Sequence, residues 1–429
     1  FMSQSGTIGI TILDYAAEYG IGIRNFISVG NKPDVSGNDV MEYWAEEEGS
    51  RVILMYLENF GNPRKFVNLA RRVTREKPVI AVKSGRTTAG VRAVSSHTGV
   101  LASQDVAVDA LFAQCGVIRV DTVEELFDLA MAFGHLPVPA GNRVGIVTNA
   151  GGPGIIIADA CESEGLEVPE LTPATQSRLR GVLAAEASVS NPVDMIATAT
   201  AQHYESALGI VLEDPNIDAV IAAFVPPLGV RQVDVASAIV AARRANPEKP
   251  LLAVLMGREG LPQGRAELQR AGVPAYIFPE SASRALAAMD RYRRWQQRPV
   301  GTIRTFEADR EGAAERLAEV AAEGRELVTG PEALAVLRAY GIPTARYQVA
   351  QNAVEAARVA REVGFPVVLK VLSPDIPYKR DLGGVVLDLR TPSEVSQAYE
   401  SMMERVRAAQ PYARIEGVMV QQYVKGGRE

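Results

Sequence analysis

The chain has 429 residues, of which 47% are hydrophobic and 22% charged, so it is long enough for about two to four globular domains. Its formal net charge of −6 excludes a strong basic field for nucleic acid or an acidic membrane surface, and favours small-molecule partners. The two cysteines, Cys115 and Cys161, form neither a disulfide framework nor a CxxC metal pair, which indicates a reducing cytoplasm.

The ends of the chain and its hydropathy give two further expectations. No apolar run approaches the roughly 20 residues that span a bilayer, and no basic leader opens the chain. We therefore expect a soluble, cytoplasmic protein with no membrane partner and no nucleic-acid partner. Because the chain begins at Phe1 and stops directly after "KGGRE", we also expect it to be an excerpt of a longer protein.

Apolar runs typical of buried strands alternate along the chain with amphipathic stretches typical of helices. The runs are 51–57, 78–85, 143–152, 218–226, 250–257 and 366–373. Continuous apolar strands separated by helices predict parallel sheets that are covered on both faces, and hence an α/β fold. A Pro/Gly-rich stretch at 135–143 ends a first unit, a charged stretch at 293–311 ends a second, and a third begins at Gly330.

Two glycine-rich loops lead from predicted strands into predicted helices. The residues of interest are Ser3, Ser5, Gly6 and Thr7 in "SQSGTIG", and Asn149, Gly151, Gly152 and Gly154 in "TNAGGPG". Glycine allows close backbone approach, and free N–H groups at a helix start favour an anion. Each loop taken alone could equally be a tight turn without a ligand, and neither is a Walker A sequence.

One of only three histidines, His97, lies in the small-residue loop "VSSHTGVLA" after the strand 78–85. A structural or surface role is the alternative for such a residue. The pattern does not favour a metal site, because no second His or Cys lies at ligand spacing. A neutral imidazole can attack phosphorus when a carboxylate orients its other nitrogen, and Glu58, at the end of the strand 51–57, is a candidate carboxylate. A solvated strand end is the alternative for Glu58.

The order of motifs resembles one family over essentially the whole chain. "SQSG", "SVGNKPDVSGNDVMEYW", "YLE", "KPVIAVKSGR", "SSHTG", "NAGGPG" and "NPVD" resemble the NDP-forming acyl-CoA synthetases, relatives of succinyl-CoA synthetase. "FPVVLKVLSPDI", "LGGVVLDLRTPSEV" and "GVMVQQYVKGGRE" look like the first part of an ATP-grasp domain. The resemblance implies two flavodoxin-like, succinyl-CoA synthetase-like parallel-sheet domains (1–140 and 141–300), a linker (301–329) and a partial ATP-grasp domain (330–429).

The resemblance also implies an activity and roles for residues. In that family an acyl-CoA, ADP and phosphate interconvert with a free acid, CoA and ATP through an acyl phosphate and a phosphorylated histidine. His97 matches that histidine and Glu58 the acid that orients it. The helix starts after Ser5-Gly6-Thr7 and Gly151-Gly152 match the N-termini that hold the phosphate, where dipole ends and backbone N–H groups offset its charge.

In the third unit the resemblance implies a nucleotide site. Its expected residues are Lys370, which matches the phosphate-contacting lysine, Lys379, Gly383 and Gly384 in the loop that follows, and Glu429 of "GGRE". Mg²⁺ is expected with the nucleotide, bridging its phosphates, while no metal ligand is assigned within this chain. Asn191 and Asp194 of "NPVD" are expected to bind substrate or CoA, with a plain turn as the alternative.

Two departures from the family limit the transfer. Several members carry a histidine directly before the lysine of "PYKRD", where it can relay phosphate, and here that residue is Tyr378. The family's CoA-binding, Rossmann-type domain would precede "SQSG" and is not present in the sequence. We therefore expect a partner chain or a further part of the protein to complete the reaction, within a homo-oligomer or a larger assembly.

The leading prediction is an ADP-forming acid–CoA ligase that acts on acetate or a related short-chain acid. The alternative from another class is an acyl-CoA- or nucleotide-sensing regulatory module, as found fused to protein lysine acetyltransferases. A citrate-cleaving or malate-type CoA ligase is a third reading, because it shares the phosphohistidine. The presence of both His97 and Glu58 favours catalysis, while the acyl group and the choice between ATP and GTP stay open.

Overall fold

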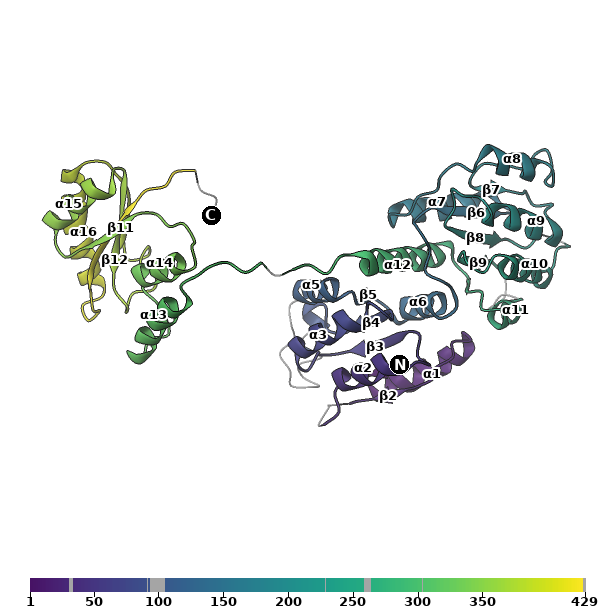
Figure 1. The fold of residues 1–429 in the computed structure, drawn as a ribbon, viewed down its shortest axis with the longest axis horizontal. Coiled ribbons are helices and arrows are strands. Elements are labelled where there is room, and N and C mark those ends of the chain that lie inside the picture. Colours follow the sequence, from purple (N-terminus) through teal and green to yellow (C-terminus); the bar gives the residue numbers. More distant parts are fainter. Residues whose placement is uncertain are drawn as a thin grey trace. The chain divides into compact units, whose positions relative to one another are not determined.

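The computed structural model of the protein describes residues 1–30, 34–90, 92, 105–227, 229–257, 264–302 and 304–426. The chain divides into two compact units, Phe1–Pro299 and Val300–Glu429 (Figure 1). In the described part of the chain, no helix is both long enough and apolar enough to cross a membrane.

The first unit begins with a parallel five-stranded sheet in the order β2-β1-β3-β4-β5. Its elements are β1 (Met2–Ser3), α1 (Gly6–Glu18), β2 (Ile27–Ser28), α2 (Gly37–Glu46), β3 (Ile53–Leu57), α3 (Pro63–Val73), β4 (Val79–Lys83), α5 (Asp105–Cys115), β5 (Ile118–Val120) and α6 (Val123–His135). This order is the 2-1-3-4-5 arrangement of flavodoxin-like folds. The helices α2, α3 and α5 bury one face of the sheet, and α1 and α6 bury the other.

A second parallel five-stranded sheet follows in the order β10-β9-β8-β6-β7. Its elements are β6 (Val144–Thr148), α7 (Gly151–Ser163), α8 (Pro173–Arg180), β7 (Val193–Asp194), α9 (Ala201–Leu212), β8 (Ala219–Phe224), α10 (Gln232–Ala245), β9 (Leu251–Leu255), α11 (Arg265–Arg270), β10 (Ala275–Tyr276) and α12 (Pro279–Gln297). Read from β7, the strands again follow the order 2-1-3-4-5. The two sheets therefore share one topology.

Local sequence explains where these helices begin. Helix α3 is typical: the Asn62 side chain accepts a hydrogen bond from the Lys65 N–H at 3.1 Å, and Pro63 occupies the first turn. Such a cap satisfies an N–H group that has no partner within the helix, and proline at this position loses no hydrogen bond. The apolar residues Phe66 and Leu69 then fall on one buried face.

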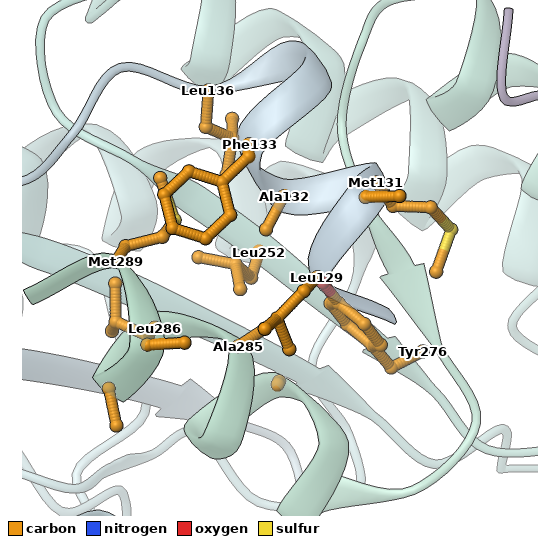
Figure 2. Packing of buried hydrophobic residues seen from close by; sticks show 14 of the residues in the cluster. Leu129, Met131, Ala132, Phe133, Leu136, Leu252, Tyr276, Ala285, Leu286 and Met289 are labelled. Atoms are coloured by element: carbon orange, nitrogen blue, oxygen red, sulfur yellow. The ribbon is translucent and has the colours of Figure 1, made fainter. Parts of the chain in front are cut away.

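One hydrophobic core joins the two sheets of the first unit. Figure 2 shows residues of α6 facing residues of α12, with Leu252 of β9 and Tyr276 of β10 alongside. Phe133 of α6 meets Tyr292 of α12 edge to face, with ring centroids 5.6 Å apart. Because α6 and α12 are buried between the sheets, residues 1–299 form a single compact unit.

A buried carboxyl lies within this shared layer. Asp128 of α6 is 6% exposed, and its Oδ2 has no hydrogen-bond partner in the part of the chain that the structure describes. Tyr276 donates a hydrogen bond to the Asp128 main-chain oxygen at 2.9 Å. Burial raises the pKa of the Asp128 carboxyl to about 6, although a hydrogen bond from Ser281 opposes the shift. The ionised form is therefore costly in the folded protein.

We predict that Asp128→Asn stabilises the first unit at neutral pH. The folded-state pKa lies above the unfolded value, so the free energy of unfolding falls as pH rises from about 4 to 6 and stays lower above that, by at most roughly 3 kcal/mol. Asparagine removes this loss, so we expect a gain of about 1–3 kcal/mol at pH 7.5 and little change at pH 4. Urea unfolding followed by fluorescence measures it, because Trp44 and Trp295 both lie in the first unit.

The exposed acid Asp159 of α7 supplies the control for this substitution. Asp159→Asn should change the stability little at either pH, because an exposed carboxylate keeps its solvation on folding. A stability difference between Asp128→Asn and wild type that is the same at pH 4 and pH 7.5 would show that burial of the charge is not its cause.

The second unit contains an antiparallel four-stranded sheet in the order β11-β14-β12-β13. Its elements are α13 (Arg310–Ala322), α14 (Gly330–Ala339), β11 (Tyr347–Ala350), α15 (Ala353–Val363), β12 (Val367–Leu372), β13 (Val385–Leu389), α16 (Pro392–Ala409) and β14 (Gly417–Gln422). The helices α15 and α16 bury one face of the sheet (Figure 1).

The structure confirms the predicted fold class and changes two details. All six predicted apolar runs form strands, but the run 366–373 becomes β12 of an antiparallel sheet rather than a parallel one. Its neighbours β13 and β14 are less uniformly apolar, and for this reason the pattern of runs did not reveal them. The stretch 301–329, expected as a linker, includes helix α13, which packs against α14.

Candidate active site

Both parallel sheets place a glycine-rich loop at the point where the strand order reverses. In the first sheet β1 has β2 on one side and β3 on the other, and in the second sheet β6 has β7 and β8. Ligands of open α/β sheets bind at the carboxyl ends of the strands at this switch point. The loops after β1 and β6 are the two loops that the sequence singled out.

In the first loop, side chains fold back onto the main chain. The Ser3 hydroxyl donates to the Ser5 main-chain oxygen at 2.6 Å and accepts from the Ser5 N–H at 3.1 Å. Ser5 caps α1 by accepting from the Ile8 N–H, at 3.5 Å. Ser3 is fully buried, whereas Gly6 and Thr7 are exposed. The exposed part of the predicted phosphate-binding set is therefore the helix start itself.

Glu58 follows β3, next to this loop. Its main-chain N–H donates to the Gln4 side-chain oxygen, and Leu57 before it accepts from the Ser84 N–H at 2.9 Å. The residue is half-buried, and within the described part of the chain its carboxylate takes neither a hydrogen bond nor an ion pair. The main chain of Glu58 is held in place while its carboxylate is left free. The carboxylate can therefore accept a hydrogen bond from a further donor, such as an imidazole N–H.

A buried lysine at the same sheet edge was not predicted. Lys83 ends β4, is 5% exposed, and donates to the Ser84 main-chain oxygen at 2.5 Å. Burial lowers the pKa of its ammonium, Arg119 lowers it further, and the carboxylates of Asp105 and Glu58 oppose the shift. The sequence signal was the lysine in "VKSGR", which closes an apolar strand as Glu58 does.

The second loop repeats the geometry of the first. The Thr148 hydroxyl donates to the Ala150 main-chain oxygen at 3.0 Å and accepts from the Ala150 N–H at 3.1 Å. Asn149 donates to the Val225 oxygen at 2.8 Å and accepts from the Val225 N–H at 2.9 Å. The predicted phosphate-binding role of Asn149 stays a prediction, and one donor and one acceptor of its amide bond the residue directly after β8. Gly151 and Gly152, at the start of α7, are exposed.

Asp194 lies against this helix start. Its Oδ1 accepts from the Ile196 N–H at 3.0 Å, and a Cβ added to Gly151 would come within 3.3 Å of its Oδ2. A side chain at position 151 would therefore require the Asp194 carboxylate to shift by a few tenths of an ångström. Ile196 adopts a φ of 60°, which is strained for a β-branched residue. The structure thus brings Asp194 to the predicted phosphate loop of α7.

Asn191, the other residue of "NPVD" that was predicted to meet substrate, is engaged structurally. Its Oδ1 accepts from the Ile146 N–H at 2.9 Å, and its Nδ2 donates to the oxygens of Val144 at 2.8 Å and Pro169 at 2.9 Å. All of these partners are main-chain atoms. Asn191 therefore ties β6 to the edge of its sheet, and the site role predicted for it stays a prediction.

We predict that Asn191→Ala destabilises the first unit by about 2–4 kcal/mol, because three hydrogen bonds are lost and buried main-chain groups are left without partners. Urea unfolding monitored by tryptophan fluorescence measures the change. Asp194→Asn, which keeps the side-chain shape and an acceptor for Ile196, is the matched comparison and should cost less than about 1 kcal/mol. Equal losses for the two variants would contradict the structural role of Asn191.

The second unit holds a pocket of about 240 Å³ on the face of its sheet opposite α15 and α16. Its lining is Gly330, Pro331, Ala333 and Leu334 of α14, Lys370, Val371 and Leu372 of β12, Lys379, and Met419 and Gln421 of β14. Lys370 donates to the Gln421 side-chain oxygen at 2.6 Å. Burial and the nearby Lys379 lower the pKa of the Lys370 ammonium, and burial lowers that of Lys379. The apolar lining suits a nucleotide base, and the two lysine ammonium groups suit its phosphates.

The loop 379–384 places Lys379 at this pocket. Gly384 donates to the Lys379 oxygen at 2.8 Å, and a Cβ on Gly384 would lie 2.6 Å from the Val371 side chain. Gly383 adopts a φ of 65°, which favours glycine. Both glycines therefore allow the loop to adopt this conformation, and only their main-chain atoms could contact a ligand. Tyr378, directly before Lys379, is 77% exposed.

Two predicted site residues, His97 and Glu429, lie outside the described residues. The chain is described up to Arg92 and again from Asp105, where α5 begins. Among the described residues, no group of three or more His, Cys, Asp and Glu side chains is arranged to hold a metal ion.

Comparisons with known proteins match the order of these domains. The chain matches the succinyl-CoA ligase-like flavodoxin domain at residues 1–133, the Ligase-CoA domain at 144–301 and an ATP-grasp domain at 319–429. It is 36% identical over 430 residues to acetate–CoA ligase (ADP-forming) I of Archaeoglobus fulgidus, which covers 100% of this chain and 61% of that protein. In the order of its matched domains the chain is similar, over its full length, to the NDP-forming acyl-CoA synthetases.

Two further members of the NDP-forming acyl-CoA synthetase family show how far the likeness extends. The 4-hydroxybutyrate–CoA ligase (ADP-forming) of Nitrosopumilus maritimus is 36% identical over 430 residues, covering 100% of this chain and 61% of that protein. Acetyl-coenzyme A synthetase 1 of Ca. Korarchaeum cryptofilum, solved with phosphate and ADP, matches at a TM-score of 0.66 and 31% identity, over 69% of this chain and 64% of that one. The chain thus spans about three fifths of these relatives.

Proposed function

We propose that this chain carries the phosphoryl-transfer part of an ADP-forming acid–CoA ligase that acts on a short-chain acid. The observation that carries the proposal is Glu58, whose backbone is fixed at the switch point of a 2-1-3-4-5 sheet beside the start of α1. Its carboxylate has no partner among the described residues. The resemblance assigns to Glu58 the role of the acid that orients a phosphorylated histidine, and the similar proteins are named as acid–CoA ligases.

The proposed reaction proceeds in three steps. A phosphate oxygen bonds to the thioester carbon of an acyl-CoA, the carbon–sulfur bond breaks, and CoA leaves as its thiolate. A nitrogen of His97 then bonds to the phosphorus of the acyl phosphate, and the acid leaves as its carboxylate. Finally a β-phosphate oxygen of ADP takes the phosphoryl group, and the phosphorus–nitrogen bond breaks to give ATP and neutral histidine.

Each unit contributes a distinct part of this scheme. Glu58 would accept a hydrogen bond from the second imidazole nitrogen of His97, which keeps the attacking nitrogen unprotonated. The starts of α1 and α7 would offer backbone N–H groups to the phosphoryl oxygens, without any basic side chain. Lys370 and Lys379 would balance the charge of the nucleotide phosphates, and Mg²⁺ would enter with the nucleotide.

The proposal extends to parts outside the matched region. We assign the CoA site to those parts of the family that this chain does not span, whether they lie in the same chain or in a partner chain. The exposed Tyr378 cannot carry phosphate as a histidine would, so we propose that phosphate passes directly from His97 to the nucleotide. The free, buried thiols of Cys115 and Cys161 are consistent with a cytoplasmic compartment.

Stoichiometry tests the proposal on the full-length protein. With acetyl-CoA, ADP, phosphate and Mg²⁺, we expect one ATP for each free thiol released, measured by luciferase and by thiol titration, and neither product when phosphate is omitted. Propionyl-CoA and 4-hydroxybutyryl-CoA in the same assay would rank the acyl groups. Saturable acetyl-CoA binding without release of ATP or thiol would contradict the ligase and support the ligand-sensing module.

A further inference from the structure

Gln4 is a buried amide that joins the two strand ends of the first switch point. It is 6% exposed. Its Nε2 donates to the Asn59 main-chain oxygen at 2.8 Å, and its Oε1 accepts from the N–H groups of both Asn59, at 2.9 Å, and Glu58. Every donor and acceptor contact crosses from the loop after β1 to the loop after β3. The amide thus replaces sheet hydrogen bonds beyond the point where these strands pair.

The second sheet contains the same device at the same place. Asn149 bonds both main-chain groups of Val225 and so joins the loop after β6 to the end of β8. In each loop the amide follows a hydroxyl residue, Ser3 or Thr148, that holds the main chain two positions further on. The same arrangement occurs in two sheets of the same topology, which indicates that the amide has a structural role in this type of loop.

The two devices differ in what they hold. Gln4 reaches one residue further than Asn149 and also binds the main chain of Glu58. The position before Val225 is Phe224, a fully buried strand residue with no polar side chain. On its other side, the Glu58 peptide is fixed through Leu57, which accepts from the Ser84 N–H at 2.9 Å and from the Ser84 hydroxyl at 3.3 Å. Gln4 therefore holds an acid where Asn149 holds only a strand end.

We propose that Gln4 is a positioning residue that fixes the backbone of Glu58 and so aims the Glu58 carboxylate at the phosphoryl-accepting imidazole. This inference rests on the proposed function. Gln4 and Ser84 hold the peptide before Glu58 from its two ends, so removal of the Gln4 acceptor leaves the buried Glu58 N–H without that partner and the peptide held only through the Leu57 oxygen. A displacement of about 1 Å in an orienting group is enough to reduce the rate strongly.

A double-mutant cycle tests whether Gln4 acts through Glu58. In the full-length protein, Gln4→Met keeps the length of the side chain and removes its hydrogen bonds. We expect the single-turnover rate of His97 phosphorylation from acetyl-CoA and phosphate to fall about 10- to 100-fold, the range seen for groups that orient metal ligands. In the Glu58→Gln background the same substitution should cost less than about 3-fold, because the acid it positions is already absent.

Asn149→Leu is the matched comparison, since it removes the equivalent clamp without touching Glu58. Its effect should multiply with that of Glu58→Gln. Gln176→Met removes an amide-to-main-chain hydrogen bond of 2.9 Å in α8 and should leave the rate unchanged. If Gln4→Met proves unfolded by tryptophan fluorescence, Gln4→Asn, which keeps an amide but shortens its reach, takes its place in the cycle and should show the same coupling to Glu58→Gln.

The outcomes separate this inference from the function on which it rests. A wild-type protein that never phosphorylates His97 would overturn the proposed function. A wild-type protein that phosphorylates His97, together with a Gln4→Met loss that is equal in the presence and absence of the Glu58 carboxylate, would overturn the positioning role alone. Coupled losses would establish that role.

Discussion

His97→Ala should lower the rate of ATP formation from acetyl-CoA, ADP and phosphate by at least about 10⁴-fold. In the proposed scheme the substitution removes the atom that carries the phosphoryl group between two reactions, and loss of a covalent nucleophile commonly costs this much or more. The first step should survive, because a phosphate oxygen rather than the histidine attacks the thioester. Phosphate-dependent release of one CoA thiol per enzyme, measured in a single turnover, should therefore persist in the variant.

Loss of ATP formation with thiol release retained would distinguish a loss of phosphoryl transfer from a general loss of folding. His97→Gln should behave as His97→Ala does, since an amide nitrogen cannot accept phosphate. If either variant retained more than about 1% of wild-type ATP formation, the phosphoryl group would have to travel by another route, and the scheme of three steps would be wrong.

Lys370→Met should weaken ADP binding by about 10- to 100-fold and leave phosphorylation of His97 from acetyl-CoA and phosphate intact. Lys370 projects from β12 on the face away from the core, where its ammonium lines the pocket with Lys379. A charge-assisted bond to phosphate contributes about 1.5–3 kcal/mol, which corresponds to this range. Isothermal titration calorimetry with ADP measures the binding, and rapid-quench labelling measures the phosphorylation.

The pH dependence of ADP binding gives a second readout of the same residue. The pKa of the Lys370 ammonium is lowered, so the wild-type protein should begin to lose affinity for ADP at a pH below the ordinary lysine range. Lys370→Met should lose the part of this dependence that comes from Lys370, while Lys379, whose pKa burial also lowers, retains the rest. Lys425→Met, at an exposed lysine paired with Asp388, is the control and should bind ADP as the wild type does. If Lys370→Met bound ADP with wild-type affinity, the nucleotide would not bind in this pocket.

The sequence predicted those parts of the site that depend on short-range signals. Glycines between an apolar strand and a helix located the loops after β1 and β6, and the acid that closes "YLE" located Glu58. Both features act within a few residues of the chain. The switch points followed only from strand order, because β1, β2, β7 and β10 are two residues long and leave no periodic pattern.

Contacts between distant residues could not be predicted in this way. Gln4 bonds residues 54 and 55 positions away, and Asn191 bonds a strand 45 positions away. An asparagine in a Pro-containing turn is equally suited to bind a ligand or a main chain, so the pattern alone did not decide between them. The core shared by the two sheets could be predicted from a short stretch of sequence. Residues from Leu126 to Phe133 of α6 are nearly all apolar, as expected of a helix buried on all sides, and the structure buries them.

The most direct test is mass spectrometry of the full-length protein under non-acidic conditions, after incubation with Mg²⁺ and ATP or with acetyl-CoA and phosphate. We predict one acid-labile phosphate on His97 from either side of the reaction, absent in His97→Ala, reduced in Glu58→Gln and discharged by ADP. If nucleotide binds at the Lys370 pocket and no phosphate reaches His97 from either side, the ligase assignment is contradicted and the chain belongs to a sensing module.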